Sequence, residues 1–381
     1  MVKYIFLFAI FIAPFETILD SFFWTFLGER TEIFTPDWVR ALDEILSVLL
    51  FVLLFYRMTQ KQKIFYSTNV IYTVLIVITS ISIIFSFIYN PIIIVASGLK
   101  WGIYIFLIGL FFYLSDDEKD FIHKNIITIL IGFVLINFCM QILQLFTLAH
   151  YFGPTFFGLS QRTIGFFREP NTLALFNIIS FYFIFTYMQK SVLKFILIYI
   201  ILPTSIIITG SMTSILTFSL VLIVLNTNLN LKNFFYFFIF LIIIFYFIAP
   251  YIPSRPGLEN SIFVRFDIIL ENLKFQNLFF SQMFGYGTNT AVLLNESAMV
   301  PDSTIASFLI NNGTISTIAL YLLFFRLFEL QKAKLFIVCI VGMSLTNCIF
   351  SAYPMNLLIV FELSFLLSYF RNQGAKNEYT Y

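Results

Sequence analysis

Two arginines lie six residues apart in the segment QRTIGFFREPN, residues 161–171, directly before a long apolar run. Pro170 suits the first turn of a helix, and Glu169, held extended by the proline that follows it, can act as the helix cap. A helix that begins here brings its free N–H groups next to Arg162 and Arg168. Because the helix dipole and the guanidinium groups attract the same charge, the segment predicts a binding site for phosphate. The alternative is that Arg168 pairs with Glu169 or reaches lipid headgroups.

A third arginine occurs in SIFVRFDIILENLKFQNLFF, residues 261–280. The apolar residues of this segment gather on one face at helical spacing, which predicts an amphipathic helix on a membrane surface. Arg265 lies at the edge of the apolar arc, where it can reach inward, although most of the charged face is typical of a solvated anchor. In FGYGTNT, residues 284–290, Gly285 and Gly287 permit tight turns. The segment is not expected to bind nucleotide, because no strand precedes it.

One carboxylate stands at the start of the apolar segment PDSTIASFLINNGTIS, residues 301–316. Asp302 and Ser303 have the residue types of a helix cap, which is their ordinary role. A carboxylate at the membrane surface can also accept a proton from a sugar hydroxyl, and the two roles are compatible.

Two further polar features lie inside apolar runs. Lys100 in ASGLKWGIYIF is expected to face a cavity or a partner; the alternative is a pairing with a carbonyl or carboxylate inside the bundle. Charge inside the membrane is expected to be nearly confined to Lys100. Asn137, Gln141 and Gln144 recur at helical spacing and form one polar stripe. Hydrogen bonds between helices explain such a stripe, and the lining of a polar cavity is the alternative.

The composition requires that a bilayer surround these sites. Of 381 residues, 60% are hydrophobic and only 11% are charged, and the mean hydropathy is +0.94. A water-soluble fold cannot hide so much apolar surface, so an all-α membrane protein is expected. The net charge of +2, with no basic run, argues against nucleic acid as a partner. The three cysteines and two histidines are dispersed, so neither disulfides nor a metal site is expected.

A membrane-spanning helix needs about 20 mostly apolar residues. Twelve runs approach that length, at about 4–19, 41–56, 66–89, 92–114, 125–148, 172–188, 195–209, 213–226, 234–250, 304–325, 335–350 and 354–370. No repeat or linker divides the chain, which predicts a single polytopic membrane domain over 1–381. The N-terminus has no small-residue cleavage site, so it is expected to be a retained helix.

The distribution of basic residues predicts the orientation of these helices. Every short linker on the side of the N-terminus carries Lys or Arg, so both termini are expected in the cytoplasm. The longest linkers, 149–171 and 251–303, then lie outside and hold most of the remaining arginines. Linkers of that length are more often functional than passive, and these two are expected to form the active face.

The order of motifs resembles a known family. The first motif is Arg-x-x-Gly-x-Phe followed, after two residues, by Pro-Asn, and it occurs here as RTIGFFREPN, residues 162–171. A later outer segment contains a predicted helix with an arginine, the sequence FGYG and the sequence DSTIASFLINNG. This combination, over roughly 127–323, is similar to the O-antigen polymerase and O-antigen ligase superfamily (Wzy and WaaL types). The resemblance implies a metal-independent membrane glycosyltransferase without a cofactor, at the outer face of the bacterial cytoplasmic membrane. Its implied partners are an undecaprenyl-diphosphate-linked oligosaccharide, the lipid bilayer, a chain-length regulator and a flippase.

By position, the resemblance implies that Arg162 and Arg168 hold the diphosphate and that Arg265 is a further contact. Asn171 and Lys100 are additional candidates for substrate binding. Glu169 and Asp302 are the candidate proton acceptors. Asp302 stands at about the place where ligases have a histidine, which favours a polymerase that joins repeat units of O-antigen, capsule or a similar polysaccharide.

One departure and two alternatives remain open. Family members usually have an arginine where TGSMTS, residues 209–214, has Met212. A ligase would use the same chemistry on a different acceptor. A flippase or transporter of lipid-linked oligosaccharide would need repeats or charges along a path through the membrane, whereas the polar groups of this sequence gather in the outer linkers.

Overall fold

Every element in the described part of the chain is a helix. The computed structural model describes residues 1–12, 42–60, 70–89, 92–147, 163–167, 170–226, 283–285, 303–345, 347–350 and 352–378, and no strand occurs among them. The prediction of an all-α protein is confirmed for these residues. The amphipathic helix predicted over 261–280 and the span predicted near 234–250 lie outside them.

The helices follow the predicted apolar runs closely. An N-terminal helix covers Val2–Ile12, and the others are α3 Leu42–Gln60, α4 Val70–Tyr89, α5 Ile92–Leu110, α6 Asp116–Thr147, α7 Pro170–Tyr187, α8 Val192–Ile196, α9 Leu202–Ile208, α10 Met212–Asn226, α15 Thr304–Phe328, α16 Lys334–Ser344 and α17 Met355–Glu378. A 3-10 turn, Phe111–Tyr113, follows α5, and a π-helical segment, Leu197–Ile201, joins α8 to α9.

Within the part of the chain that the structure describes, three helices are long and apolar enough to cross a membrane, judged by length and composition. They are Val70–Ile88, Asp116–Phe146 and Thr304–Phe328, and several shorter apolar helices accompany them. Large apolar side chains such as Val77, Ile84 and Phe146 are exposed on α4 and α6. An apolar solvent around the bundle explains this exposure. The full count of twelve spans stays a prediction.

The helix ends carry the expected stop and start signals. The α6 helix begins with a capping box, in which Glu118 Oε2 accepts from the Ser115 N–H (2.9 Å) and Ser115 Oγ accepts from the Glu118 N–H (3.3 Å). The α7 helix begins at Pro170, as predicted. Ser303 caps α15 through a bond from the Ala306 N–H (3.4 Å), which confirms the capping role predicted for Ser303.

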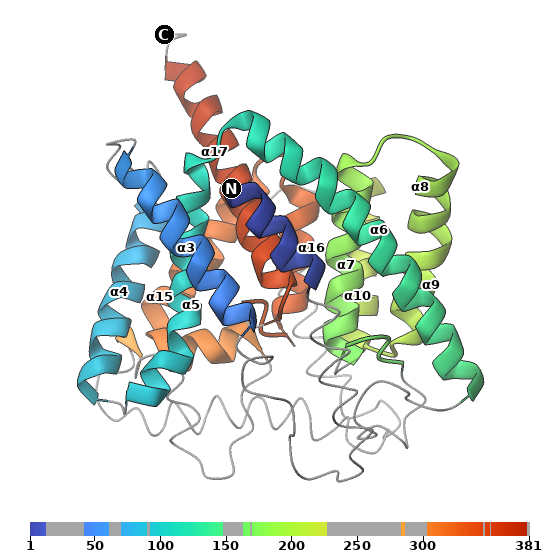
Figure 1. Cartoon of the computed structure of the whole chain (residues 1–381), viewed down its shortest axis with the longest axis horizontal. Helices are drawn as coiled ribbons and strands as arrows, with labels where there is room; N and C mark the ends of the chain where they lie inside the picture. The colour runs from blue at the N-terminus through green and yellow to red at the C-terminus, as the bar shows by residue number, and fades with distance from the viewer. Residues whose placement is uncertain are drawn as a thin grey trace.

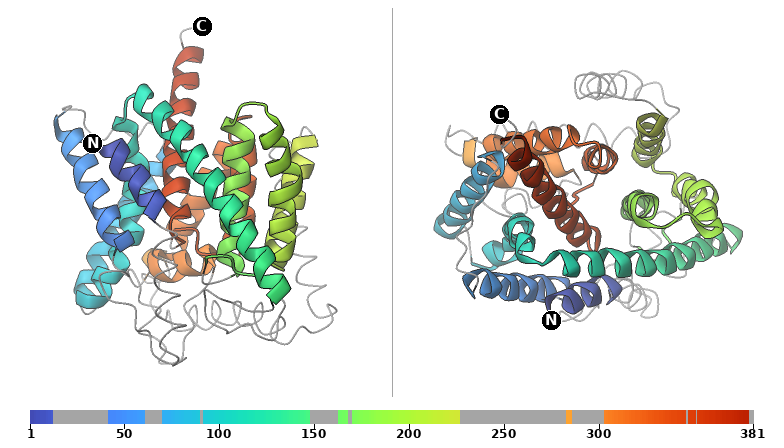
Figure 2. Two further views of the ribbon diagram at one scale, coloured as in Figure 1. Left: turned by 45° about the vertical axis from the view of Figure 1, so that its right-hand side comes forward. Right: turned by 90° about the horizontal axis from the view of Figure 1, so that it is seen from above.

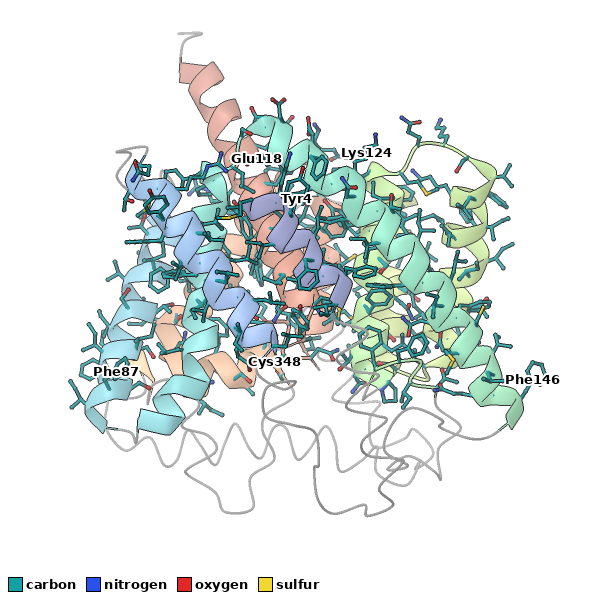
Figure 3. The ribbon with its side chains drawn as sticks, in the orientation of Figure 1. Tyr4, Phe87, Glu118, Lys124, Phe146 and Cys348 are labelled. Atoms are coloured by element: carbon teal, nitrogen blue, oxygen red, sulfur yellow. The ribbon has the colours of Figure 1, made fainter. Side chains whose placement is uncertain are left out.

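The bundle has two chemically different ends (Figures 1 and 3). Glu118 and Lys124 lie at one end, and Phe87, Phe146 and Cys348 lie at the other. We call the first the cationic end. Lys124 lies there, Arg57 pairs with Glu118 (2.8 Å), and Lys3 lies over the Phe121 ring. The other basic residues whose side chains the structure describes belong to the ends and connections of helices: Lys119, Lys190, Lys194, Arg326, Lys332 and Lys334. The N-terminal helix starts near this end and α17 runs out beyond it. Both termini therefore share one end, and which compartment that end faces stays a prediction.

The α7 helix is central and α6 is peripheral. From Leu173 to Ile184 every residue of α7 is buried. The longest helix, α6, lies along one side of the bundle, with α3 and α5 near one of its ends and α7 to α10 near the other (Figure 2). The α17 helix crosses the space between these groups.

The α15 helix is broken, although the sequence predicts one continuous span there. Gly313 has φ 79° and ψ 177°, outside the helical region. Ser303 Oγ donates to Ser344 O (3.4 Å), while Tyr321 OH lies 2.7 Å from Ser344 Oγ. A straight helix would hold residues 303 and 321 about 27 Å apart, too far for both to reach one serine. The half-helix Thr304–Asn312 therefore crosses the bundle at the end opposite the cations, and the second half rises from it (Figure 1).

Candidate functional site

The structure describes the neighbours of the predicted site residues better than those residues themselves. Asn171 lies in the first turn of α7 and is half-buried, and the backbone of Lys100 belongs to α5. The remaining candidates lie outside the described residues: Arg162, Arg168, Glu169, Arg265 and Asp302. The structure does place the turn between Arg162 and Arg168, and the residue that follows Asp302.

The turn between the two arginines is held by the polar stripe of α6. Gln144 Oε1 accepts from the backbone N–H groups of Ile164 (3.1 Å) and Gly165 (3.0 Å), and Gln144 Nε2 donates to Gly165 O (3.0 Å). Asn137 Oδ1 accepts from the Phe166 N–H (2.9 Å). Asn137 and Gln144 thus satisfy three consecutive backbone N–H groups of one turn.

Gln141 extends this network to a neighbouring helix. Its Nε2 donates to Thr163 Oγ1 (2.8 Å) and to Ser205 O (3.1 Å), and its Oε1 accepts from Ser205 Oγ. Asn177 Nδ2 in turn donates to Ser205 Oγ (2.8 Å). We call Asn137, Gln141 and Gln144 the amide clamp. Of the two interpretations left open for the stripe, hydrogen bonding is the one observed, and most of it is directed at the turn 163–167.

The geometry of the turn requires its glycine, and its phenylalanine packs the turn on α7. Gly165 has φ 55°, a conformation that side chains rarely adopt, and a Cβ there would lie 2.5 Å from Asn137 Oδ1. The Phe167 N–H closes the turn on Ile164 O (2.9 Å), and the Phe167 ring packs on Phe176 of α7 at 5.1 Å. The motif residues Gly165 and Phe167 therefore fix the turn to α6 and α7. The arginines follow at its two ends in the sequence.

The FGYG motif and the DSTIASFLINNG motif are in contact, through Gly285 and Gly313. A Cβ on Gly285 would lie 2.3 Å from Asn311 O, and a Cβ on Gly313 would lie 2.3 Å from Met283 O. Both glycines have positive φ, so the tight turn predicted at Gly285 is confirmed. Ser82 of α4 donates to Asn311 O (2.8 Å). The paired glycines allow Met283–Gly285 to lie directly against the break in α15.

The start of α15 is anchored where α16 and α17 meet. The Thr304 N–H and Thr304 Oγ1 both donate to Asn347 O, at 3.1 Å and 2.7 Å. Thr304 Oγ1 accepts from the Ile349 N–H at 3.0 Å. Since Asp302 precedes this anchored cap by one residue, the chain is fixed immediately after the candidate base.

Sequence reasoning missed Glu362, a fully buried carboxylate in the middle of α17. Its Oε1 accepts from Tyr182 OH (2.5 Å) and Tyr187 OH (2.6 Å), and its Oε2 lies 3.0 Å from His123 Nε2. The His123 ring stacks on Tyr187 at 4.3 Å. We call these four residues the acid cluster.

The signal for Glu362 was present in the sequence. It is the one acidic residue in the apolar run MNLLIVFELSFLLSYF, residues 355–370, and the rule that singled out Lys100 applies equally to it. Glu362 is therefore a further ionisable residue, in addition to Lys100, inside the predicted spans, and the expectation about membrane-embedded charge left it out.

Chemically, the described part of the site offers a rigid turn and a helix N-terminus, both at the end opposite the cations. Among the described residues, no group of three or more His, Cys, Asp or Glu side chains could hold a metal ion. No protein-family model matches the chain, and a search of the curated proteins finds no match. What the arrangement can bind therefore follows from its own donors and acceptors.

Proposed function

We propose that the protein polymerises undecaprenyl-diphosphate-linked oligosaccharide repeat units at the outer face of the bacterial cytoplasmic membrane. The observation that carries the proposal is the amide clamp, which fixes the turn between Arg162 and Arg168 directly before the N-terminus of α7. A helix N-terminus and two guanidinium groups suit a diphosphate. The cationic end would face the cytoplasm, in keeping with the positive-inside rule.

The reaction follows from the charge of the leaving group. A hydroxyl of the acceptor sugar attacks the anomeric carbon, the bond from that carbon to the diphosphate breaks, and negative charge grows on the phosphate oxygens. Arg162 and Arg168, with Arg265 as a further contact, stabilise that charge in a partly dehydrated site. Glu169 or Asp302 accepts the proton of the attacking hydroxyl.

Asn171 and Lys100 complete the proposed contacts. Asn171 lies one residue inside α7, in the first turn of that helix. Lys100 is the basic residue of α5, a helix that packs on α4 and α17. The cap of α15 at Ser303 supports the role of Asp302, because the chain is anchored from the residue that follows it.

The acid cluster favours a transporter as the second candidate function. Buried Glu and His pairs inside membrane bundles often carry protons in pumps and transporters. Here, however, both carboxylate oxygens of Glu362 are already engaged by partners on α6 and α7. That saturation suits a fixed link between helices, so the polymerase is preferred. A ligase would share the chemistry and would join its product to lipid A core.

Replacing Arg168 tests the proposal in cells. Arg168→Ala should reduce the surface polysaccharide to single repeat units, measured as the ladder on a gel, while the amount of protein in the membrane stays unchanged. Arg326→Ala, at the cationic end, is the matched control and should leave the ladder intact. A normal ladder from Arg168→Ala would eliminate the proposed role. Movement of labelled lipid-linked sugar across liposomes without lengthening would favour the transporter.

A further inference from the structure

The break in α15 holds polar atoms that have no partner. Asn311 Oδ1, Asn312 Nδ2 and Ser316 Oγ make no hydrogen bond, although these residues are only 5%, 1% and 0% exposed. Buried polar atoms in folded proteins are almost always paired, because an unpaired one costs stability. Single unpaired atoms also occur elsewhere in the described residues, at Asn177, Ser180, Asn347 and Ser364. Asn177 and Ser180 are two such residues on α7, whereas the break holds three within the short segment 311–316.

The backbone at the break in α15 is held by hydrogen bonds from side chains. Asn311 O accepts from Ser82 Oγ (2.8 Å), and Gly313 O accepts from Thr317 Oγ1 (2.9 Å). Met283–Gly285 lies against it through the paired glycines. Irregular backbone at membrane depth is tolerated where it is covered by protein or lines a polar site, and broken helices often form ligand sites.

The chemistry of the unpaired atoms selects the kind of ligand. Asparagine amides supply one donor and one acceptor group each, and a serine hydroxyl supplies both, so the set is neutral and mixed. Ser82 and Thr317, which bond the backbone of the break, are neutral as well. An anion would use only the donors, and a metal ion only the acceptors. A sugar ring uses both, because each of its hydroxyl groups donates and accepts.

We infer that the break in α15, through Asn311, Asn312 and Ser316, binds a sugar ring of the glycan. This inference rests on the proposed function and names the site for the uncharged part of the substrate. The half-helix Thr304–Asn312 follows Asp302 at one end and carries the amides at the other. A sugar bound at the break lies at the end of this half-helix opposite its cap at Ser303, and the arginines are the proposed ligands of the diphosphate.

Two probes separate the sugar site from the diphosphate site. The full-length protein in lipid nanodiscs is titrated with the repeat-unit oligosaccharide released from the polysaccharide of the producing strain, and separately with farnesyl diphosphate. Asn312→Leu should weaken oligosaccharide binding at least tenfold and leave farnesyl diphosphate binding unchanged. It should also raise the Tm by about 2 °C, because it removes an unpaired buried amide. Ser316→Ala, which deletes a single oxygen, should weaken oligosaccharide binding in the same direction.

Two control variants remove polar side chains that do not belong to the break in α15. Asn125→Leu and Ser80→Ala remove an amide and a hydroxyl that bond only within their own helices, and should change neither titration. Oligosaccharide binding that is undetectable in the unaltered protein, or equal in Asn312→Leu and Ser316→Ala, would overturn the inference. Failure of the proposed function is distinguishable, because Arg168→Ala would then leave farnesyl diphosphate binding unchanged.

Discussion

Two buried polar networks involve α6, and they differ in what they bind. The amide clamp, towards the end opposite the cations, makes most of its bonds to the turn 163–167, four of them to the backbone of that turn. The acid cluster, towards the cationic end, joins the side chains of α6, α7 and α17 to one another. The first is neutral and the second contains groups that can carry charge.

This difference in bonding partners indicates that the amide clamp positions a site and that the acid cluster stabilises the fold. Bonds from side chains to consecutive backbone N–H groups fix the path of one short segment, and here that segment runs between the two candidate diphosphate ligands. Bonds among side chains of three helices fix the helices relative to each other. We therefore expect damage to the clamp to reduce activity first, and damage to the acid cluster to reduce stability first.

Removing the carboxylate of the acid cluster should have the largest effect. Glu362→Ala leaves Tyr182, Tyr187 and His123 buried without their shared acceptor, so the free energy of unfolding should fall by about 3–5 kcal/mol. Size-exclusion chromatography and thermal unfolding of the purified protein measure the loss. Glu362→Gln keeps one acceptor oxygen and should lose less. An unchanged Tm in Glu362→Ala would mean that the cluster does not hold the helices.

A methyl group on the clamped turn should have the next largest effect. Gly165→Ala forces alanine into a left-handed conformation and places its Cβ 2.5 Å from Asn137 Oδ1. The cost should be about 2 kcal/mol, and the polymer yield should fall at least tenfold. Gly132→Ala on α6 is the matched control, because nothing lies within 4 Å of a Cβ there. A normal amount of polymer from Gly165→Ala would mean that the activity does not depend on the conformation of the turn 163–167.

Replacing the clamp side chain itself is expected to cost about as much stability as Gly165→Ala. Gln144→Leu leaves the N–H groups of Ile164 and Gly165 without an acceptor, at a cost of about 1–3 kcal/mol. Polymer length on a gel should nevertheless shorten strongly, since the turn is no longer held. Asn125→Leu, an amide of α6 that bonds only to Phe121 O, should leave polymer length unchanged. A loss of stability without shorter polymer would assign the clamp to the fold alone.

Local signals in the sequence predicted the local features of this molecule. Pro170 predicted the start of α7, the types of Asp302 and Ser303 predicted a cap, and the spacing of Asn137, Gln141 and Gln144 predicted a polar stripe. Each of these depends on residues within a few turns of each other. The helical class followed from composition alone.

The features that depend on distant contacts were not predictable. Nothing local to Gln144 indicates that it accepts from the backbone about twenty residues later. The break at Gly313 depends on Gly285, whose segment packs on it from elsewhere in the chain. Glu362 could be singled out as an acidic residue in an apolar run, but its partners on α6 and α7 could not be named.

The central claim is that the amide clamp positions Arg162 and Arg168, and diphosphate binding tests this claim most directly. Farnesyl diphosphate is titrated into purified full-length protein carrying Arg168→Ala, Gln144→Leu or, as a control at the cationic end, Arg57→Ala. We expect at least tenfold weaker binding in the first two variants and unchanged binding in the third, even though Gln144 is not a proposed ligand. Equal binding by Gln144→Leu and the unaltered protein would contradict the claim.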